Sequence, residues 1–169
     1  MIYRIPAHQH HAWPPPLALY YDKKSMKRVV TFDITSKYDL PGEQDDLDVN
    51  KLFGWGYFNG GHHTDSVRFG WLWNQTKSLP SIYAYCYVGK VRVMNYICEV
   101  PLYTPLLMTI DKFESVYSFT VSDPVKRYFA YGGVDVPYKH NKKFAYKLGV
   151  YFGGNNPAPH EMEIKIVKP

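Results

Sequence analysis

The sequence predicts an all-β fold, a two-sheet antiparallel β-sandwich, from three observations. No segment of about ten or more residues keeps the 3.6-residue apolar period of an amphipathic helix. About ten to twelve short segments instead alternate apolar and polar residues with a period of two. Gly, Pro, Asn and Asp separate these segments at regular spacing, as in sandwich folds. The 169 residues are expected to form one domain, residues 1–169, with a sizeable core.

The first three strands are expected before residue 36. A short strand at 1–5 is ended by Pro6, and the proline-rich loop 8–16 favours an extended conformation. An apolar strand follows at 17–21. The segment 27–35 alternates clearly, and its apolar side chains should point inward. These inward side chains are Val30, Phe32 and Ile34.

The stretch 56–88 is expected to form the central hairpin. A glycine-rich turn with two adjacent histidines leads into a strand that contains Arg68, Trp71 and Trp73, and the turn 74–80 leads into a second strand at 81–88. In this second strand, three tyrosines alternate with small apolar residues, so the tyrosines share one face and the small residues share the core face. The tyrosines are Tyr83, Tyr85 and Tyr87.

The remaining strands follow the same pattern of short apolar segments and turns. Gly89-Lys90 indicates a tight turn after the tyrosine strand. Further strands are expected at 49–53, 91–100, 106–111, 115–122, 126–131, 143–152 and 161–167. With the inward residues of 27–35, the core is expected to contain Ala84, Cys86, Leu148, Val150, Ile164 and Ile166.

Composition narrows the possible environments and partners. The net charge of +5 comes from scattered basic residues, so nucleic acid is not expected as a partner. Two cysteines imply no disulfide framework. We expect no membrane insertion, because no apolar stretch approaches transmembrane length. The N-terminus lacks the apolar run of a signal peptide, which predicts a location in the cytoplasm of the producing cell or in a virion.

The segment Tyr146-Lys147-Leu148-Gly149-Val150-Tyr151 resembles a late-strand motif of alginate lyases and heparin lyase-like proteins. The resemblance implies a concanavalin A-like jelly roll, with Tyr151 as a catalytic acid or base and with Lys147 and Gly149 on the same concave face. The arginine-rich and glutamine-any-histidine motifs of that family are absent. Other segments, among them Arg-Phe-Gly-Trp, look like short uncharacterised proteins of Bacteroidetes and their phages.

Candidate ligand-binding residues come from the tyrosine strand, its neighbour and the motif strand. Aromatic rings of this kind form sugar-stacking platforms, but they also fill cores and subunit interfaces. Arg68 is a candidate clamp for a carboxylate, or an ordinary arginine packed on an aromatic ring. His62 and His63 are candidates for a general base, or are turn residues that bond the backbone. The full ligand-binding set is Tyr83, Tyr85, Tyr87, Lys147, Tyr151, Arg68 and Trp71.

These observations predict a non-catalytic binding or assembly protein whose partner is a glycan or another protein. A phage capsid decoration or tail component is the specific form that we expect, and a homo-oligomer is an open alternative. The alternative function is a polysaccharide lyase on uronate-containing glycans, with Tyr151, His62, His63 and Arg68 as its catalytic residues. Neither a metal nor another cofactor is expected, because no ligand spacing typical of a metal site occurs.

Overall fold

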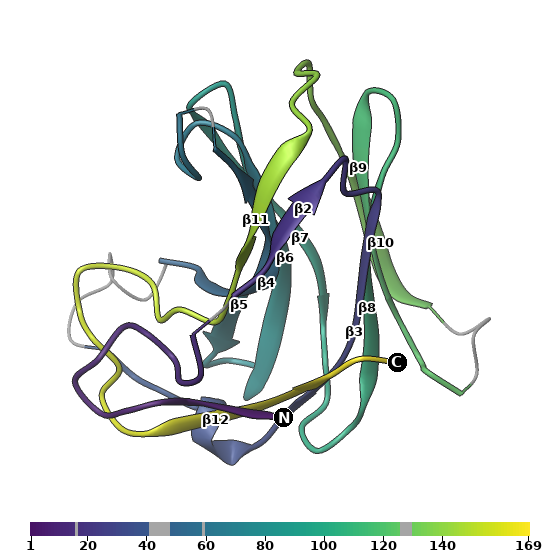
Figure 1. The fold of residues 1–169 in the computed structure, drawn as a ribbon. Helices are drawn as coiled ribbons and strands as arrows, with labels where there is room; N and C mark the ends of the chain where they lie inside the picture. Colours follow the sequence, from purple (N-terminus) through teal and green to yellow (C-terminus); the bar gives the residue numbers. More distant parts are fainter. Residues whose placement is uncertain (16, 41–47, 59, 126–129) are drawn as a thin grey trace.

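The chain folds into two antiparallel sheets of six strands each, packed face to face (Figure 1). The structure is a computed structural model that describes residues 1–15, 17–40, 48–58, 60–125 and 130–169. The first sheet has the strand order β1-β12-β3-β8-β9-β10, and the second, which we call the groove sheet, has the order β2-β11-β4-β5-β6-β7. The predicted two-sheet sandwich is therefore confirmed.

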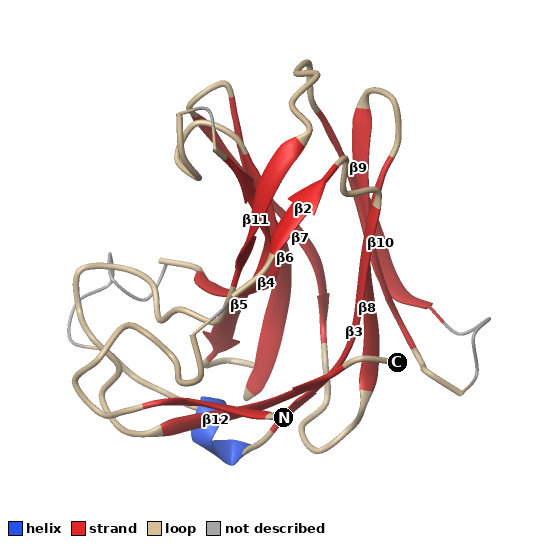
Figure 2. Ribbon diagram, viewed as in Figure 1, coloured by secondary structure: helices blue, strands red, loops and turns tan. Residues whose placement is uncertain are grey.

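The strand bounds follow the predicted order along the chain. Figure 2 shows that strands dominate the described residues, with a single short 3-10 helix, η1 (Ile34–Ser36). The strands are β1 (Ile2–Ile5), β2 (Leu19–Tyr21), β3 (Ser25–Phe32), β4 (Asn50–Tyr57), β5 (Ser66–Asn74), β6 (Leu79–Val88), β7 (Val91–Glu99), β8 (Leu106–Lys112), β9 (Val116–Ser122), β10 (Ala130–Pro137), β11 (Phe144–Leu148) and β12 (Met162–Val167).

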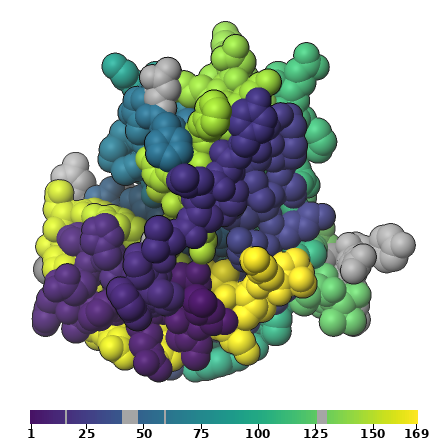
Figure 3. All heavy atoms as spheres, viewed as in Figure 1, coloured from purple at the N-terminus to yellow at the C-terminus, as the bar shows by residue number. Residues whose placement is uncertain are grey.

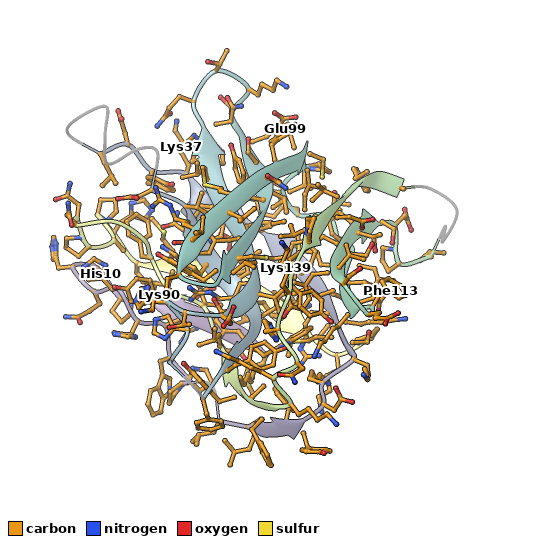
Figure 4. All side chains as sticks on the ribbon, turned by 90° about the horizontal axis from the view of Figure 1, so that it is seen from above. His10, Lys37, Lys90, Glu99, Phe113 and Lys139 are labelled. Carbon is orange, nitrogen blue, oxygen red and sulfur yellow. The ribbon has the colours of Figure 1, made fainter. Side chains whose placement is uncertain are left out.

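Side chains from both sheets fill the space between them, as Figure 4 shows from above. Aromatic rings span this layer. The ring of Phe69 on β5 lies 5.0 Å from the ring of Phe119 on β9, and Trp55 on β4 lies 6.2 Å from Tyr117 on β9. Both pairs meet edge to face, an arrangement that adds to the stability gained from apolar burial. The sheets are therefore joined by an aromatic core.

One end of this core carries a polar network. The hydroxyl of Tyr117 lies 3.2 Å from the hydroxyl of Tyr57 and 2.7 Å from Nε2 of His140. The Nε1–H of Trp55 donates to the Tyr57 hydroxyl over 3.0 Å. Burial lowers the pKa of His140 to about 4, so its imidazole is neutral at neutral pH.

The tight turn predicted at Gly89-Lys90 joins β6 to β7. Both residues have positive φ, 56° at Gly89 and 72° at Lys90. Positive φ at both central positions is typical of the two-residue hairpin turns whose twist matches that of the strands. This turn fixes the register in which the tyrosine strand pairs with β7.

Two predicted core residues lie elsewhere. Ile34 is 54% exposed, because β3 ends at Phe32 and η1 follows. The side chain of Asp33 accepts from the N–H of Thr35 over 2.9 Å and caps this short helix, which breaks the alternation that predicted an inward Ile34. Leu148 faces the groove described below, because the register of β11 places it opposite Gly54 on the outer face.

Trp71 and Trp73 occupy the core face of β5 and not the face of the tyrosines. Trp71 is fully buried, and its ring lies 5.7 Å from Phe32 and 5.5 Å from Tyr38. Trp71 lies three positions after Arg68 on β5, and side chains separated by an odd number of positions point to opposite faces. Only one of the two can therefore face outward. The prediction of Trp71 as a ligand-binding residue is therefore wrong, and its alternative, core packing, holds.

Two further points concern the limits of the elements. Residues 126–129 of the strand predicted at 126–131 lie outside the described residues, and β10 begins at Ala130. No helix among the described residues is long and apolar enough to cross a membrane.

Candidate functional site

A groove with a volume of about 870 Å³ lies on the outer face of the groove sheet. Its floor comes from β4, β5 and β6, and its wall comes from residues 6–15 and 148–151. Figure 3 shows the N-terminal residues, in purple, lying against the yellow-green residues near position 150. Pockets of about 300–1,000 Å³ are the usual size for sites that bury a drug-sized ligand.

The alternation of β5 and β6 places Arg68 and Tyr85 on the floor. The two residues are directly opposite each other in the register of these strands. Val67, Phe69 and Ala84, their sequence neighbours, are fully buried on the core face. Paired residues in antiparallel strands point to the same face, so the guanidinium and the phenol share the groove.

Glycine on β4 gives Arg68 its space. Gly54 lies opposite Arg68, and a Cβ atom at Gly54 would lie 2.8 Å from Cγ of Arg68 and 2.0 Å from the carbonyl oxygen of Val67. Such distances are shorter than any van der Waals contact. Only glycine at this position lets the arginine side chain lie flat on the sheet.

Arg68 is a buried cation for which the described residues supply no compensating anion. The residue is 6% exposed, and its Nε has no hydrogen-bond partner among the described residues. It makes no ion pair within the described ranges, and its guanidinium carbon lies 5.3 Å from the ring centroid of Tyr85. Burial lowers the pKa of Arg68. A desolvated charge of this kind is costly unless a ligand supplies the missing partner.

Lys51 on β4 adds a second cation. Its Nζ lies 4.9 Å from the ring centroid of Tyr85 and 5.7 Å from that of Tyr151. Burial lowers the pKa of Lys51 to about 8, and the nearby charge of Arg68 lowers it further. Burial also raises the pKa of Tyr85 to about 12, so this phenol stays protonated beside the two cations.

Two histidines border the groove at the turn after β4. Nδ1 of His62 lies 3.3 Å from the hydroxyl of Tyr146, and the rings of His62 and His63 are 4.2 Å apart. The ring of His63 meets Tyr87 edge to face at 5.2 Å. Burial lowers the pKa of His62 to about 4, with Arg68 as a further cause, so His62 is neutral at neutral pH. A neutral imidazole can accept a proton or a hydrogen bond.

Tyr151 stands in the wall. Its backbone pairs with Lys51 through two hydrogen bonds of 2.8 and 2.9 Å. The ring of His10, which is labelled in Figure 4, stacks on Tyr151 at 5.4 Å, and the ring of His11 meets it edge to face at 5.0 Å. The phenol is thereby held at a fixed place beside the ammonium of Lys51.

Five of the residues predicted as site residues line the groove: Arg68, Tyr85, Tyr151, His62 and His63. Tyr83 and Tyr87 share the outer face of β6 with Tyr85 but do not line the groove. The ring of Tyr83 lies 5.7 Å from Tyr96, and the ring of Tyr87 lies 5.9 Å from Tyr85.

Lys147 points to the other face of β11. It is paired in register with Trp55, which is fully buried, and its Nζ lies 3.3 Å from the hydroxyl of Tyr3 on β1. The expectation that Lys147 and Tyr151 share a face is therefore wrong. Its cause is the end of β11 at Leu148, because strand parity does not carry through an irregular segment to Tyr151.

Several residues in or beside the groove were not predicted as site residues, among them Lys51, His11, Trp13 and Tyr146. Lys51 is the one charged residue in the apolar segment 49–57, and this isolation was a usable indication of function. The face of β4 to which Lys51 points depends on a β-bulge between Lys51 and Gly54. A strict two-residue alternation does not predict such a bulge. The contribution of the N-terminal loop depends on long-range pairing that no local pattern indicates.

The described residues contain no group of three or more His, Cys, Asp or Glu side chains placed to hold a metal ion. The groove presents two cations, phenols and imidazoles. Together these groups can bind an anion, donate hydrogen bonds and exchange protons.

Comparison with known proteins shows the fold. No protein-family model matches the chain, and no curated protein matches it significantly. Among solved structures, the chain is similar to the alginate lyase from Klebsiella pneumoniae, with a TM-score of 0.53 and 9% sequence identity. The match covers 99% of this chain and 57% of that protein, so the chain spans little more than half the length of this neighbour. The resemblance to a jelly roll of the alginate lyase type is thus confirmed at the level of fold.

Proposed function

We propose that this protein binds an acidic glycan, a chain that contains uronate residues, in the groove. The observation that carries the proposal is the buried guanidinium of Arg68, which faces the groove without an anionic partner among the described residues. A carboxylate can accept two parallel hydrogen bonds from a guanidinium. The protein is thus a β-sandwich binding protein, and its ligand supplies the missing negative charge.

The other groups of the groove fit the same ligand. Lys51 provides a second positive charge, and the phenols of Tyr85 and Tyr151 present an apolar ring with a polar tip. Sugar rings have both apolar faces and hydroxyl groups, so such side chains match them in both respects. The fold similarity to an alginate lyase adds support, because alginate is a polyuronate.

Calorimetric titration with acidic and neutral oligosaccharides tests this function. We expect binding of oligouronates and none of neutral oligosaccharides of the same length. Arg68→Gln should weaken the binding of oligouronates at least tenfold, because a charged hydrogen-bonding partner is lost. The matched control is Arg28→Gln on β3 in the first sheet, which changes the net charge equally and should leave the affinity unchanged. Equal affinity for neutral and acidic glycans would contradict the proposal.

A polysaccharide lyase is the second candidate. The observation that favours it is the presence of Tyr151, Lys51 and Arg68 in one groove. A lyase needs a base that removes the proton beside the uronate carboxylate, an acid that protonates the leaving oxygen, and a cation that neutralises the carboxylate. Arg68 fits the third role, and the resemblance assigns acid or base chemistry to Tyr151.

An ultraviolet assay for unsaturated uronate products separates binding from catalysis. A binding protein leaves the absorbance of alginate and of related polyuronates unchanged at the protein concentrations used in enzyme assays. A lyase produces an absorbance increase that disappears in Tyr151→Phe, while Tyr83→Phe, outside the groove, retains it. Both candidate functions require an acidic ligand in the groove, so this assay distinguishes only binding from cleavage.

Attachment to a phage particle is the assembly form of the binding function that the sequence predicts. Co-sedimentation of the purified protein with particles tests it directly. Binding that requires Arg68 would join this role to the groove, whereas the absence of binding to particles would leave the glycan function alone.

A further inference from the structure

The wall of the groove contains a second feature, which is separate from the two cations Arg68 and Lys51. Residues 6–15 leave β1 and run along residues 150–158 of the chain. Four backbone hydrogen bonds fix them there, from the N–H of His8, Ala12, Phe152 and Ala158. The bond from Phe152 to the carbonyl of His10 measures 2.8 Å, and the bond from His8 to the carbonyl of Ala158 also measures 2.8 Å. The segment is therefore an ordered wall of the groove.

Trp13 lies at the end of this wall with a fixed backbone and an open side chain. Its N–H donates to the carbonyl of Arg4 over 2.8 Å, and its carbonyl accepts from the N–H of Arg4 over 3.0 Å. Its side chain lines the groove, yet the residue is 71% exposed. The other three tryptophans, Trp55, Trp71 and Trp73, are buried. Trp13 is thus the one tryptophan that a ligand in the groove can reach.

Because the backbone of Trp13 is already fixed, a ligand that covers the indole has to order only the side chain. Its flat apolar surface suits the face of a pyranose ring, and its Nε1–H can donate to a sugar hydroxyl. Ala12 and Pro15, which also line the groove, carry no charge or hydrogen-bonding side chain. The lining that residues 12–15 contribute therefore differs in chemistry from the lining that Arg68 and Lys51 contribute.

We propose that Trp13 forms a stacking subsite for a second sugar ring of the same acidic oligosaccharide, next to the subsite at which Arg68 and Lys51 bind a carboxylate. The inference rests on the proposed function, since it places another part of the same ligand. A single uronate fills only the charged subsite. A longer oligouronate covers the indole as well, so affinity increases with chain length.

Tryptophan fluorescence of the unaltered protein provides a readout that needs no variant. Titration with a tetrauronate should shift the emission to shorter wavelength or quench it, because Trp13 is the exposed emitter. A monouronate should bind without this change in emission. The three buried tryptophans give a constant background.

The variant Trp13→Ala should weaken tetrauronate binding by roughly 3- to 10-fold, the range expected for one aromatic stacking contact, and should leave monouronate binding unchanged. Trp13→Tyr, which keeps a stacking ring, should restore most of the lost affinity. The control is Phe144→Ala, which removes an aromatic residue that is 67% exposed and outside the groove. It should bind both ligands as the unaltered protein does.

Two outcomes overturn the inference in distinguishable ways. In the first, the tetrauronate binds to the unaltered protein without a change in emission, and it binds to the Trp13→Ala variant with the same affinity. The stacking subsite is then wrong and the acidic-glycan function stands. If neither uronate binds to the unaltered protein, the proposed function fails together with the subsite. A length-dependent affinity that disappears in Trp13→Ala supports both.

Discussion

The guanidinium carbon of Arg68 lies 5.3 Å from the ring centroid of Tyr85, directly across two paired strands. This stacking partly compensates the burial of the cation, because an aromatic face attracts positive charge. It does not replace a hydrogen-bonding anion, since the Nε of Arg68 has no partner among the described residues. The free protein therefore holds a charge that a ligand would stabilise.

The first prediction concerns the stability cost of this charge. Arg68→Met keeps an unbranched apolar chain in place of the arginine methylenes and removes the desolvated charge. We expect the free energy of unfolding to stay equal or increase by about 0–2 kcal/mol, while oligouronate binding is lost. Urea denaturation monitored by circular dichroism measures the first quantity. A decrease of more than about 1 kcal/mol would mean that the stacking on Tyr85 stabilises the fold more than burial of the charge destabilises it.

The second prediction concerns pH and ligand binding. The pKa of Lys51 in the free protein is lowered to about 8. An anionic ligand favours the charged ammonium and raises this pKa, so binding takes up a proton at pH values above about 8. Affinity should be greatest below pH 8 and decrease as the pH increases beyond it. Calorimetry in buffers with different ionisation enthalpies measures the uptake, and Lys51→Met should abolish it. Proton uptake that persists in Lys51→Met would assign the effect to another group.

The third prediction concerns acid stability. Burial lowers the pKa of His62 and of His140 to about 4, below the ordinary value of 6.5. The unfolded chain therefore binds more protons than the folded one between these values, and stability is lost as the pH decreases from about 6.5 to 4. Denaturant titrations at pH 6.5 and 5 should show this loss before most carboxylates titrate. The double variant His62→Gln/His140→Gln should show a smaller decrease over the same interval. If the free energy of unfolding of the double variant decreases as much between pH 6.5 and 5 as that of the unaltered protein, neither histidine causes the loss.

The fourth prediction uses two apolar residues that lie two positions apart. Phe32 is fully buried and packs on Trp71, whereas Ile34 is 54% exposed in η1. Phe32→Ala should lower the free energy of unfolding by roughly 3–5 kcal/mol, and Ile34→Ala should change it by less than about 0.5 kcal/mol. Chemical denaturation of both variants makes the comparison. Similar losses in the two variants would contradict the strand end at Phe32.

The sequence predicted the sandwich and most of its core, because burial on one face of a strand leaves a period-two pattern. That pattern placed Phe32, Ala84 and Ile164 correctly. It failed where a strand stops. Ile34 follows an aspartate cap, and an irregular segment after Leu148 separates Lys147 from Tyr151. Parity carried across these two breaks wrongly placed Ile34 in the core and Lys147 on the face of Tyr151.

The site was only partly predictable for a related reason. Arg68 and Tyr85 share a hairpin, so local alternation places them together. Lys51 reaches them through a bulge, and Trp13 reaches the same groove from the far end of the chain. Pairing between the N-terminal loop and residues near 150 is a tertiary property, which is absent from any local pattern.

The wall of the groove is attached to both sheets. Tyr151 of the wall pairs with Lys51 of β4 in the groove sheet. Trp13 is bonded to Arg4 of β1 in the first sheet, whereas Arg68 lies on β5 in the groove sheet. The position of Trp13 relative to Arg68 is consequently expected to depend on the thickness of the aromatic layer between the sheets. We expect a change such as Phe119→Leu, made deep in that layer and outside the groove, to bring the sheets closer and to move Trp13 relative to Arg68. If the groove binds a ligand as proposed, we therefore expect that substitutions in the interior can change its preference through spacing, without altering a contacting side chain.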